Sequence, residues 1–135
     1  MKYLFDTNVW AAIQRGDQGI GDRWRKQDVG SVFLCARVLA ELFHGAIKSA
    51  RREENVKFVE SILFQHDCLA FGVFEAKRYA ELVNAVYANN QTGKVMDLEI
   101  AATASVHGLR IVTHDTEDFG KIPGIEIEDW QADKL

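Results

Sequence analysis

Two short apolar runs, near opposite ends of the chain, each lead into an aspartate. The first is Tyr3–Phe5, which Asp6 follows directly, and the second is Leu109–Thr113, which Asp115 follows after one residue. A brief apolar run of this kind is typical of a buried parallel strand. Ligand sites in open α/β sheets lie just beyond the carboxyl ends of such strands. The two runs therefore predict one acidic pocket whose carboxylates come from distant parts of the sequence.

Short apolar runs alternate with helical segments along the chain, which favours an α/β fold with a parallel β-sheet flanked by helices on both faces. The predicted strands are Tyr3–Phe5, Ser31–Cys35, Leu69–Val73, Leu109–Thr113 and Ile125–Ile127. The predicted helices are Thr7–Gln14, Asp22–Lys26, Arg37–Ala50, Glu53–Gln65, Phe74–Ala88 and Asp97–His107. Residues 89–93 are expected to form a loop, and Gly108 a helix C-cap. We expect residues 1–135 to form a single domain.

Charge and cysteine content bear on partners and compartment. The formal net charge is -4, which gives no overall attraction to nucleic acid, so a nucleic-acid role requires a local basic patch. Cys35 and Cys68 lack the spacing of a zinc site and favour free thiols in a reducing compartment. No apolar run approaches the ~18 residues of a membrane span, and no signal peptide is visible. We therefore expect a cytoplasmic protein with no membrane partner.

Two further acidic residues, Glu41 and Asp97, lie on predicted helices, and Asp118 follows Asp115 by about one helical turn. Each carboxylate also has a structural explanation, because Asp is favoured at helix N-caps and turns and Glu on exposed helix faces. Several like charges packed together, however, cannot all stay ionised without a cation. Oxygen ligands without Cys or His suit Mg²⁺ or Mn²⁺, which orient water and phosphate in phosphoryl transfer.

These acidic residues lie within four longer segments, which are Tyr3–Asn8, Leu39–Gly45, Asp97–Ala104 and Gly108–Phe119. In order and composition the segments resemble the motifs of the PIN-domain ribonucleases, in particular the VapC-type toxins of bacterial toxin–antitoxin pairs. The resemblance covers essentially the whole chain. It implies a PIN-like three-layer α/β/α fold and a Mg²⁺- or Mn²⁺-dependent endoribonuclease with RNA as substrate. It also implies a homodimer that a cognate VapB-type antitoxin blocks with its C-terminal segment.

The resemblance also implies roles for individual residues. The positions that match the family's catalytic and metal-binding quartet are Asp6, Glu41, Asp97 and Asp115. The supporting polar positions, which orient carboxylates or water, are Thr7, Asn8 and Thr113. Relatives often carry Asn at the fourth acidic position, and a downstream Asp then shares its duty. This chain has both Asp115 and Asp118, so either can be the fourth acidic ligand. Many relatives also have a hydroxyl residue near Val38, just before the segment that carries Glu41, and this chain lacks it.

Two basic clusters could contact RNA beside an acidic pocket. Residues 23–26 combine three cations with Trp24 as a stacking ring, and Lys48, Arg51 and Arg52 form the second cluster. An exposed charged helix face is the more common explanation of such a cluster, so neither is assigned as a binding site. His44 and His114 adjoin proposed ligands, but polar neighbours of this kind need no chemical role.

Two alternative functions remain open. One is a phosphatase or a differently specific phosphodiesterase on the same fold. An aspartyl phosphatase would place a second Asp two positions after Asp6, where this chain has Asn8. The other is a non-catalytic module that kept the fold, which the loss of a carboxylate would favour, yet all four are present. A tRNA loop, a ribosomal RNA loop and messenger RNA would all suit the expected pocket.

Overall fold

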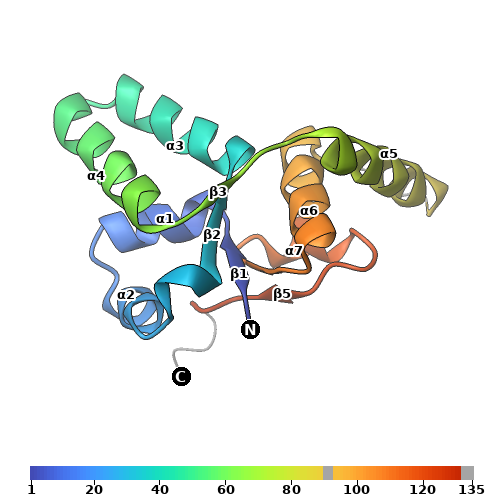
Figure 1. Ribbon diagram of the computed structural model, residues 1–135, viewed down its shortest axis with the longest axis horizontal. Helices are drawn as coiled ribbons and strands as arrows, with labels where there is room; N and C mark the ends of the chain where they lie inside the picture. The colour runs from blue at the N-terminus through green and yellow to red at the C-terminus, as the bar shows by residue number, and fades with distance from the viewer. Residues whose placement is uncertain (90–92, 132–135) are drawn as a thin grey trace.

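Five parallel strands form the centre of the computed structural model, which describes residues 1–89 and 93–131. Their order across the sheet is β3-β2-β1-β4-β5, so the first strand lies in the middle (Figure 1). The strands are β1 (Tyr3–Phe5), β2 (Val32–Cys35), β3 (Cys68–Leu69), β4 (Arg110–Val112) and β5 (Ile127–Glu128). Phe5 and Val112, the last residues of β1 and β4, are register partners. The residues that follow these two strands therefore lie side by side at the carboxyl edge of the sheet.

Helices cover the sheet in two groups. In Figure 1, α1 to α4 lie to the left of β1, and α5 to α7 lie to its right. The helices are α1 (Thr7–Gln14), α2 (Gln18–Arg25), α3 (Ala36–Lys48), α4 (Arg52–Gln65), α5 (Val73–Ala88), α6 (Val95–His107) and α7 (Thr116–Gly120). A 3-10 turn, Val29–Ser31, leads into β2, while α3 packs against α4 and α5 against α6. The predicted α/β class, with a parallel sheet between helices, is confirmed.

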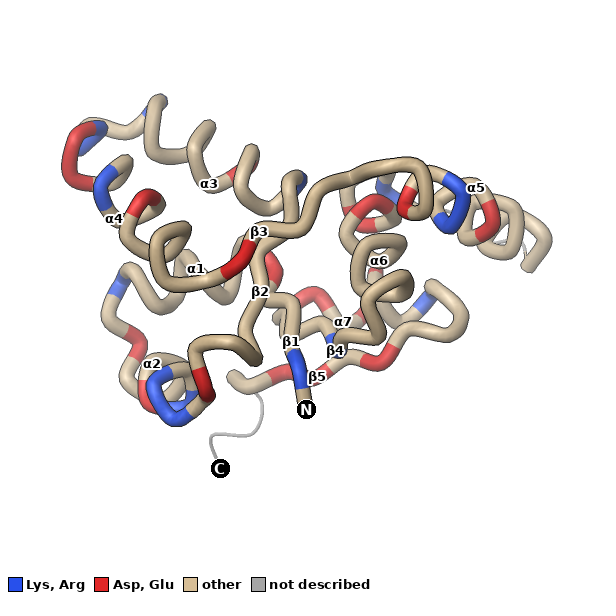
Figure 2. The backbone as a smooth tube through the Cα atoms, in the orientation of Figure 1, with Lys and Arg blue, Asp and Glu red and all other residues tan. Residues whose placement is uncertain are grey.

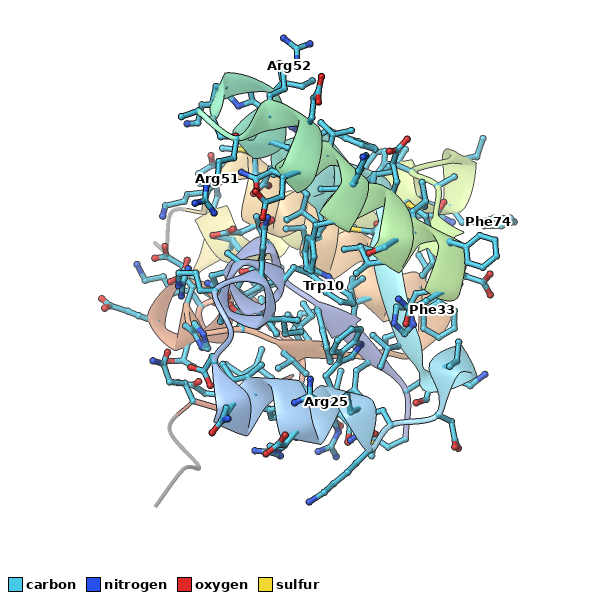
Figure 3. The ribbon with its side chains drawn as sticks, turned by 90° about the vertical axis from the view of Figure 1, so that its left-hand side faces the viewer. Trp10, Arg25, Phe33, Arg51, Arg52 and Phe74 are labelled. Carbon is cyan, nitrogen blue, oxygen red and sulfur yellow. The ribbon has the colours of Figure 1, made fainter. Side chains whose placement is uncertain are left out.

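Three aromatic side chains from distant parts of the sequence meet beneath the acidic edge of the sheet. The ring of Phe5 in β1 lies 5.0 Å from that of Trp10 in α1 and 5.0 Å from that of Trp130. All three side chains are buried, and Figure 3 shows Trp10 in the interior. Aromatic pairs of this kind add about 0.5–1.5 kcal/mol beyond their buried area. They hold α1 and the C-terminal segment against the strand that precedes Asp6.

Two predicted strands have different bounds because local contacts decide where they end. The prediction Leu69–Val73 is wrong after Leu69, since the Glu75 side chain accepts a hydrogen bond from the Gly72 backbone N–H at 2.8 Å and α5 begins there. The last strand lies at Ile127–Glu128 instead of Ile125–Ile127 because Ile127 pairs with Ile111. Helix capping and strand register, and not the length of the apolar run, thus decide where these two strands begin and end.

The helix predictions differ mainly at their N-termini. The α2 helix begins before the predicted Asp22, since the Asp17 side chain accepts a hydrogen bond from the Ile20 backbone N–H at 3.1 Å. The α6 helix begins two residues early, with Lys94 as its N-cap and Asp97 in its first turn. The C-cap Gly108 has the left-handed φ of 66° expected for that position.

The other predicted helices and strands agree with the structure to within two residues at each end. The short helix α7 is additional to the predicted elements. Residues 90–92 of the predicted loop lie outside the described residues.

Both cysteines are free thiols, as the sequence predicted. Cys35 is buried and Cys68 half-buried. Burial raises the pKa of the Cys35 thiol to about 12, which keeps it protonated and unreactive. Within the described ranges, no helix has both the length and the apolar character needed to cross a bilayer.

Candidate metal centre

One pocket of about 330 Å³ lies at the carboxyl edge of the sheet, and four carboxylates line it. Two of them are on helices α3 and α6, and two follow strands β1 and β4. The acidic residues that line it are Asp6, Glu41, Asp97 and Asp115. The other lining residues are Thr7, Asn8, Lys94 and Met96. The prediction that these four acids meet in one place is confirmed. Their chemical roles stay predictions.

Asp6 is buried, and both of its carboxylate oxygens accept hydrogen bonds. Oδ1 accepts from the backbone N–H of Thr7 at 2.8 Å, which makes Asp6 the N-cap of α1. Oδ2 accepts from the hydroxyl of Thr113, also at 2.8 Å. Burial raises the pKa of Asp6 above its ordinary value, although both hydrogen bonds act in the opposite direction. The Asp6 side chain therefore both caps α1 and lines the pocket. A nearby cation would favour its charged form.

The hydroxyl of Thr113, which is fully buried after β4, connects the ends of two strands. It donates to Asp6 and accepts a hydrogen bond from the backbone N–H of Asp115 at 2.9 Å. Asn8 adds a second connection, because its Oδ1 accepts from the backbone N–H of His114 at 3.2 Å. Together these contacts fix the turn that carries Asp115 relative to β1.

Glu41 reaches the pocket from the middle of α3. Its Oε2 accepts a hydrogen bond from the Thr7 hydroxyl at 2.8 Å. Burial, and to a lesser degree the charge of Asp6, raises the pKa of Glu41. An ion pair of 2.6 Å between Arg37 and Glu99 joins α3 to α6. Glu99 is thus ion-paired and does not line the pocket.

Asp97, Asp115 and Asp118 form a tight cluster, in which one oxygen of each lies within 4.8 Å of the others. Asp97 comes from the first turn of α6, Asp115 is the N-cap of α7, and Asp118 lies in that short helix. Burial first, and then the charges of Asp6 and Asp115, raise the pKa of Asp97 to about 6. The Oδ2 atom of Asp97 is buried and has no hydrogen-bond partner among the residues that the structure describes.

Asp118 differs from its neighbours because two lysines neutralise it. Its Oδ2 lies 2.8 Å from Lys94 Nζ, and its Oδ1 lies 3.8 Å from Lys121 Nζ. The hydrogen bond from Lys94 lowers the pKa of Asp118 and raises that of the lysine. Sequence reasoning missed Lys94. Its place one helical turn before Asp97 is the signal that could have identified it.

In the first basic cluster, residues 23–26, three of the four side chains contact other parts of the protein. Arg23 lies over the ring of Trp130, 4.5 Å from its centre, and Arg25 pairs with Asp22 at 2.7 Å. Trp24 packs against the core, and its indole N–H donates to His66 at 3.1 Å. The packing of Trp24 therefore favours the structural explanation of this cluster over an RNA contact.

The second predicted basic cluster surrounds the turn between α3 and α4. Figure 3 shows Arg51 and Arg52 pointing into solvent from this turn. In Figure 2 the same end of the helix pair carries acidic as well as basic positions. Arg51 pairs with Glu54 at 3.7 Å. The charges there are mixed, as on an ordinary exposed helix face.

The donor atoms of the pocket fit a hard divalent cation. All of its negatively charged groups are carboxylates, and carboxylate oxygens are the ligand type that such ions prefer. The buried, unpartnered Oδ2 of Asp97 and the raised carboxyl pKa values both indicate negative charge that lacks compensation. A bound cation would supply that compensation. Asp6, Glu41, Asp97 and Asp115 are the residues placed to hold it, with Asp118 beside them.

Comparison with known proteins places this pocket in a family. Residues 3–125 match the sequence profile of the PIN domain. Ribonuclease VapC of Rickettsia bellii is 32% identical over 130 residues, which cover 94% of this chain and 95% of that protein. The tRNA(fMet)-specific endonuclease VapC of Shigella flexneri is 27% identical over 131 residues, with 96% and 98% covered.

A solved structure supports the same grouping. The DNA-bound VapBC of Salmonella typhimurium contains a chain that superposes with a TM-score of 0.88 at 28% identity. The superposition covers 96% of this chain and 98% of that one. The chain described above thus belongs to the PIN-domain family and, within it, to the VapC ribonucleases.

Proposed function

We propose that the chain is an endoribonuclease that uses Mg²⁺ or Mn²⁺ to hydrolyse RNA phosphodiester bonds, and that it acts as the toxin of a toxin–antitoxin pair. One observation carries the metal dependence: four carboxylates line a single pocket, and one of their buried oxygens has no partner in the described structure. Membership of the VapC ribonucleases supports RNA as the substrate.

We assign the cation to Asp6 and Asp97 most directly, with Asp115 and Glu41 joining directly or through water. The position of Asp115 in the pocket wall supports it as the fourth acid. The two lysines beside Asp118 support a secondary, charge-balancing role for that residue. When bound, a divalent ion supplies positive charge beside the scissile phosphate and lowers the pKa of water in the site.

The residues of the chain itself orient the reaction. Thr7 holds one oxygen of Glu41, which fixes the direction of the carboxylate, and the raised pKa of Glu41 makes it a better proton acceptor. We assign Glu41 to position the water that attacks phosphorus in line with the leaving oxygen. Thr113 and Asn8 hold the two strand ends so that Asp6 and Asp115 line the same pocket, where we place the scissile phosphate. The 2′-hydroxyl of RNA is not required for this route.

A phosphatase or a non-catalytic module is not favoured. Asn8 occupies the position where an aspartyl phosphatase needs a second acid, and its side chain holds the β4–α7 turn instead. A non-catalytic module has no need to keep four acids around one pocket.

Purified protein, freed of any antitoxin, is expected to cut RNA with Mg²⁺ or Mn²⁺ and to stop when EDTA removes the ion. Excess Mn²⁺ should then restore cutting, because the ion supplies charge that the acidic pocket lacks. Gel analysis of end-labelled RNA measures this and separates internal cleavage from trimming of the ends. Asp6→Asn serves as the inactive, folded control. If neither ion supports cutting, or if the control cuts normally, the proposal is wrong.

The proposed partners are a VapB-type antitoxin and a second copy of the chain. The similarity to a VapBC complex supports the antitoxin, and the family resemblance supports the homodimer. An RNA substrate and two free thiols fit the cytoplasm, which we propose as the compartment.

Expression of the chain alone should arrest bacterial growth, because unblocked cleavage would destroy cellular RNA. Co-expression of the neighbouring small gene should restore growth, as measured by colony counts after induction. Asp6→Asn should leave growth unaffected at the same protein level. Arrest by this variant would mean that toxicity does not come from the pocket.

A further inference from the structure

Lys94 lies in the acidic pocket, and the proposed reaction gives it no role beyond balancing the charge of Asp118. It lines the pocket together with the four acids, and among the described lining residues it alone is a lysine or arginine. Its side chain is 64% exposed, although its ammonium group lies 2.8 Å from Asp118 Oδ2. The cation is therefore accessible from solvent at the place where an RNA phosphate would have to approach.

We propose that Lys94 binds a phosphate group of the RNA substrate, and that Asp118 holds the ammonium group in position until RNA arrives. The proposal rests on the nuclease function. It assigns a substrate contact to a residue that matches none of the family's acidic or supporting positions.

The exchange of partners is favourable for Lys94. An exposed ion pair between two side chains is weak and easily replaced. A phosphate oxygen accepts the same kind of charge-assisted hydrogen bond as a carboxylate oxygen, so the ammonium group loses no bond in the exchange. A flexible four-carbon side chain with three donors can follow the phosphate over several ångströms.

Asp118 is not left without a cation when Lys94 turns away. Lys121 Nζ lies 3.8 Å from the other carboxylate oxygen of Asp118, and it does not line the pocket. One lysine of the pair is thus placed to stay with Asp118, while the other is placed to contact substrate. If the Lys94–Asp118 ion pair served only to join α6 to α7, a second lysine, Lys121, would not be needed beside Asp118.

The position of Lys94 in the chain brings the bound phosphate to the reacting carboxylates. Lys94 is the N-cap of α6, and Asp97 lies in the first turn of the same helix. Their distance is therefore set by one helical turn. The positive end of the helix dipole also lies at this terminus and favours an anion.

The test is the salt dependence of RNA binding, measured by fluorescence anisotropy with a labelled short single-stranded oligoribonucleotide in EDTA. Loss of one phosphate contact is expected to lower the slope of log K against log salt by about 0.7 for a single strand. Lys94→Gln should show this decrease, and Lys94→Arg should restore the slope. The matched control is Lys121→Gln. It removes the same positive charge next to the same carboxylate, that of Asp118, and should keep the wild-type slope.

Cleavage kinetics separate this proposal from the nuclease function. Lys94→Gln should raise KM several-fold with Mg²⁺ present, while Lys121→Gln leaves it unchanged. If the wild type cuts RNA and Lys94→Gln keeps both its salt slope and its KM, Lys94 is only a helix-to-helix ion pair and the proposal is wrong. If the wild type cuts no RNA but the slope still falls in Lys94→Gln, the phosphate contact stands and the nuclease function is wrong.

Discussion

Asp97→Asn is expected to abolish RNA cleavage and, in the absence of metal, to make the protein more stable at neutral pH. The loss of cleavage should be at least about 100-fold, because removing even the groups that support metal ligands costs about 10–100-fold. The gain in stability has a different origin. The Oδ2 atom of Asp97 is buried without a hydrogen-bond partner in the described structure, and its neighbours Asp6 and Asp115 repel its charge.

The pH dependence of this stability has a definite sign. The pKa of Asp97 rises from 3.8 to about 6 in the folded protein, so the folded state binds the proton more tightly than the unfolded chain does. The contribution of this carboxyl to stability is therefore complete below 3.8 and is lost as the pH rises through about 6. Asn carries no charge at any pH. The Tm of the metal-free variant should exceed that of wild type above this range, and the difference should vanish in acid.

Thermal unfolding with and without Mg²⁺ measures both effects. Mg²⁺ should raise the Tm of wild type by binding the folded state, and it should raise the Tm of Asp97→Asn much less. Asp22→Asn is the matched control, because it removes an exposed carboxylate that pairs with Arg25 and does not line the pocket. If metal-free Asp97→Asn melts below wild type at neutral pH, the Asp97 carboxylate stabilises the fold. Its charge then does not lower stability in exchange for function, and the expectation is wrong.

The strand ends were predictable because a parallel sheet places all its carboxyl ends at one edge. Asp6 and Asp115 follow the neighbouring strands β1 and β4, whose last residues, Phe5 and Val112, are register partners. The two apolar runs, Tyr3–Phe5 and Leu109–Thr113, are visible in the sequence, so the shared edge could be predicted without knowing the register. The helical acids were harder to predict, since a helix has several faces. Glu41 and Asp97 were candidates from the residues alone, and the family resemblance joined them to Asp6 and Asp115 in one quartet.

The contacts that organise the pocket could not be predicted, because they join residues far apart in the chain. The Thr7 hydroxyl meets Glu41 across 34 positions, and the Arg37–Glu99 ion pair spans 62. No local periodicity carries such pairings. The pairing of Lys94 with Asp118 likewise depends on where α6 begins, which the sequence placed two residues late.

Thr113→Val is expected to lower the free energy of unfolding and to slow RNA cleavage, although the two side chains have nearly the same shape. Valine lacks the hydroxyl that donates to Asp6 Oδ2 and accepts from the backbone N–H of Asp115. Both groups would lose a partner at a residue that is 0% exposed. Unsatisfied buried groups cost about 1–3 kcal/mol, so we expect a loss of that order in urea denaturation.

Thr103→Val is the matched control for this substitution. Thr103 is also buried, at 2% exposure, but its hydroxyl donates to the carbonyl of Glu99 within its own helix at 3.0 Å. A helical carbonyl keeps its backbone partner when the hydroxyl is removed, so stability and cleavage should change little. In Thr113→Val, cleavage should fall about 10–100-fold, because Asp6 loses the group that fixes its direction. Equal, small effects of the two substitutions would mean that the remaining contacts, the capping hydrogen bond from Thr7 and the aromatic packing of β1, are enough to position Asp6.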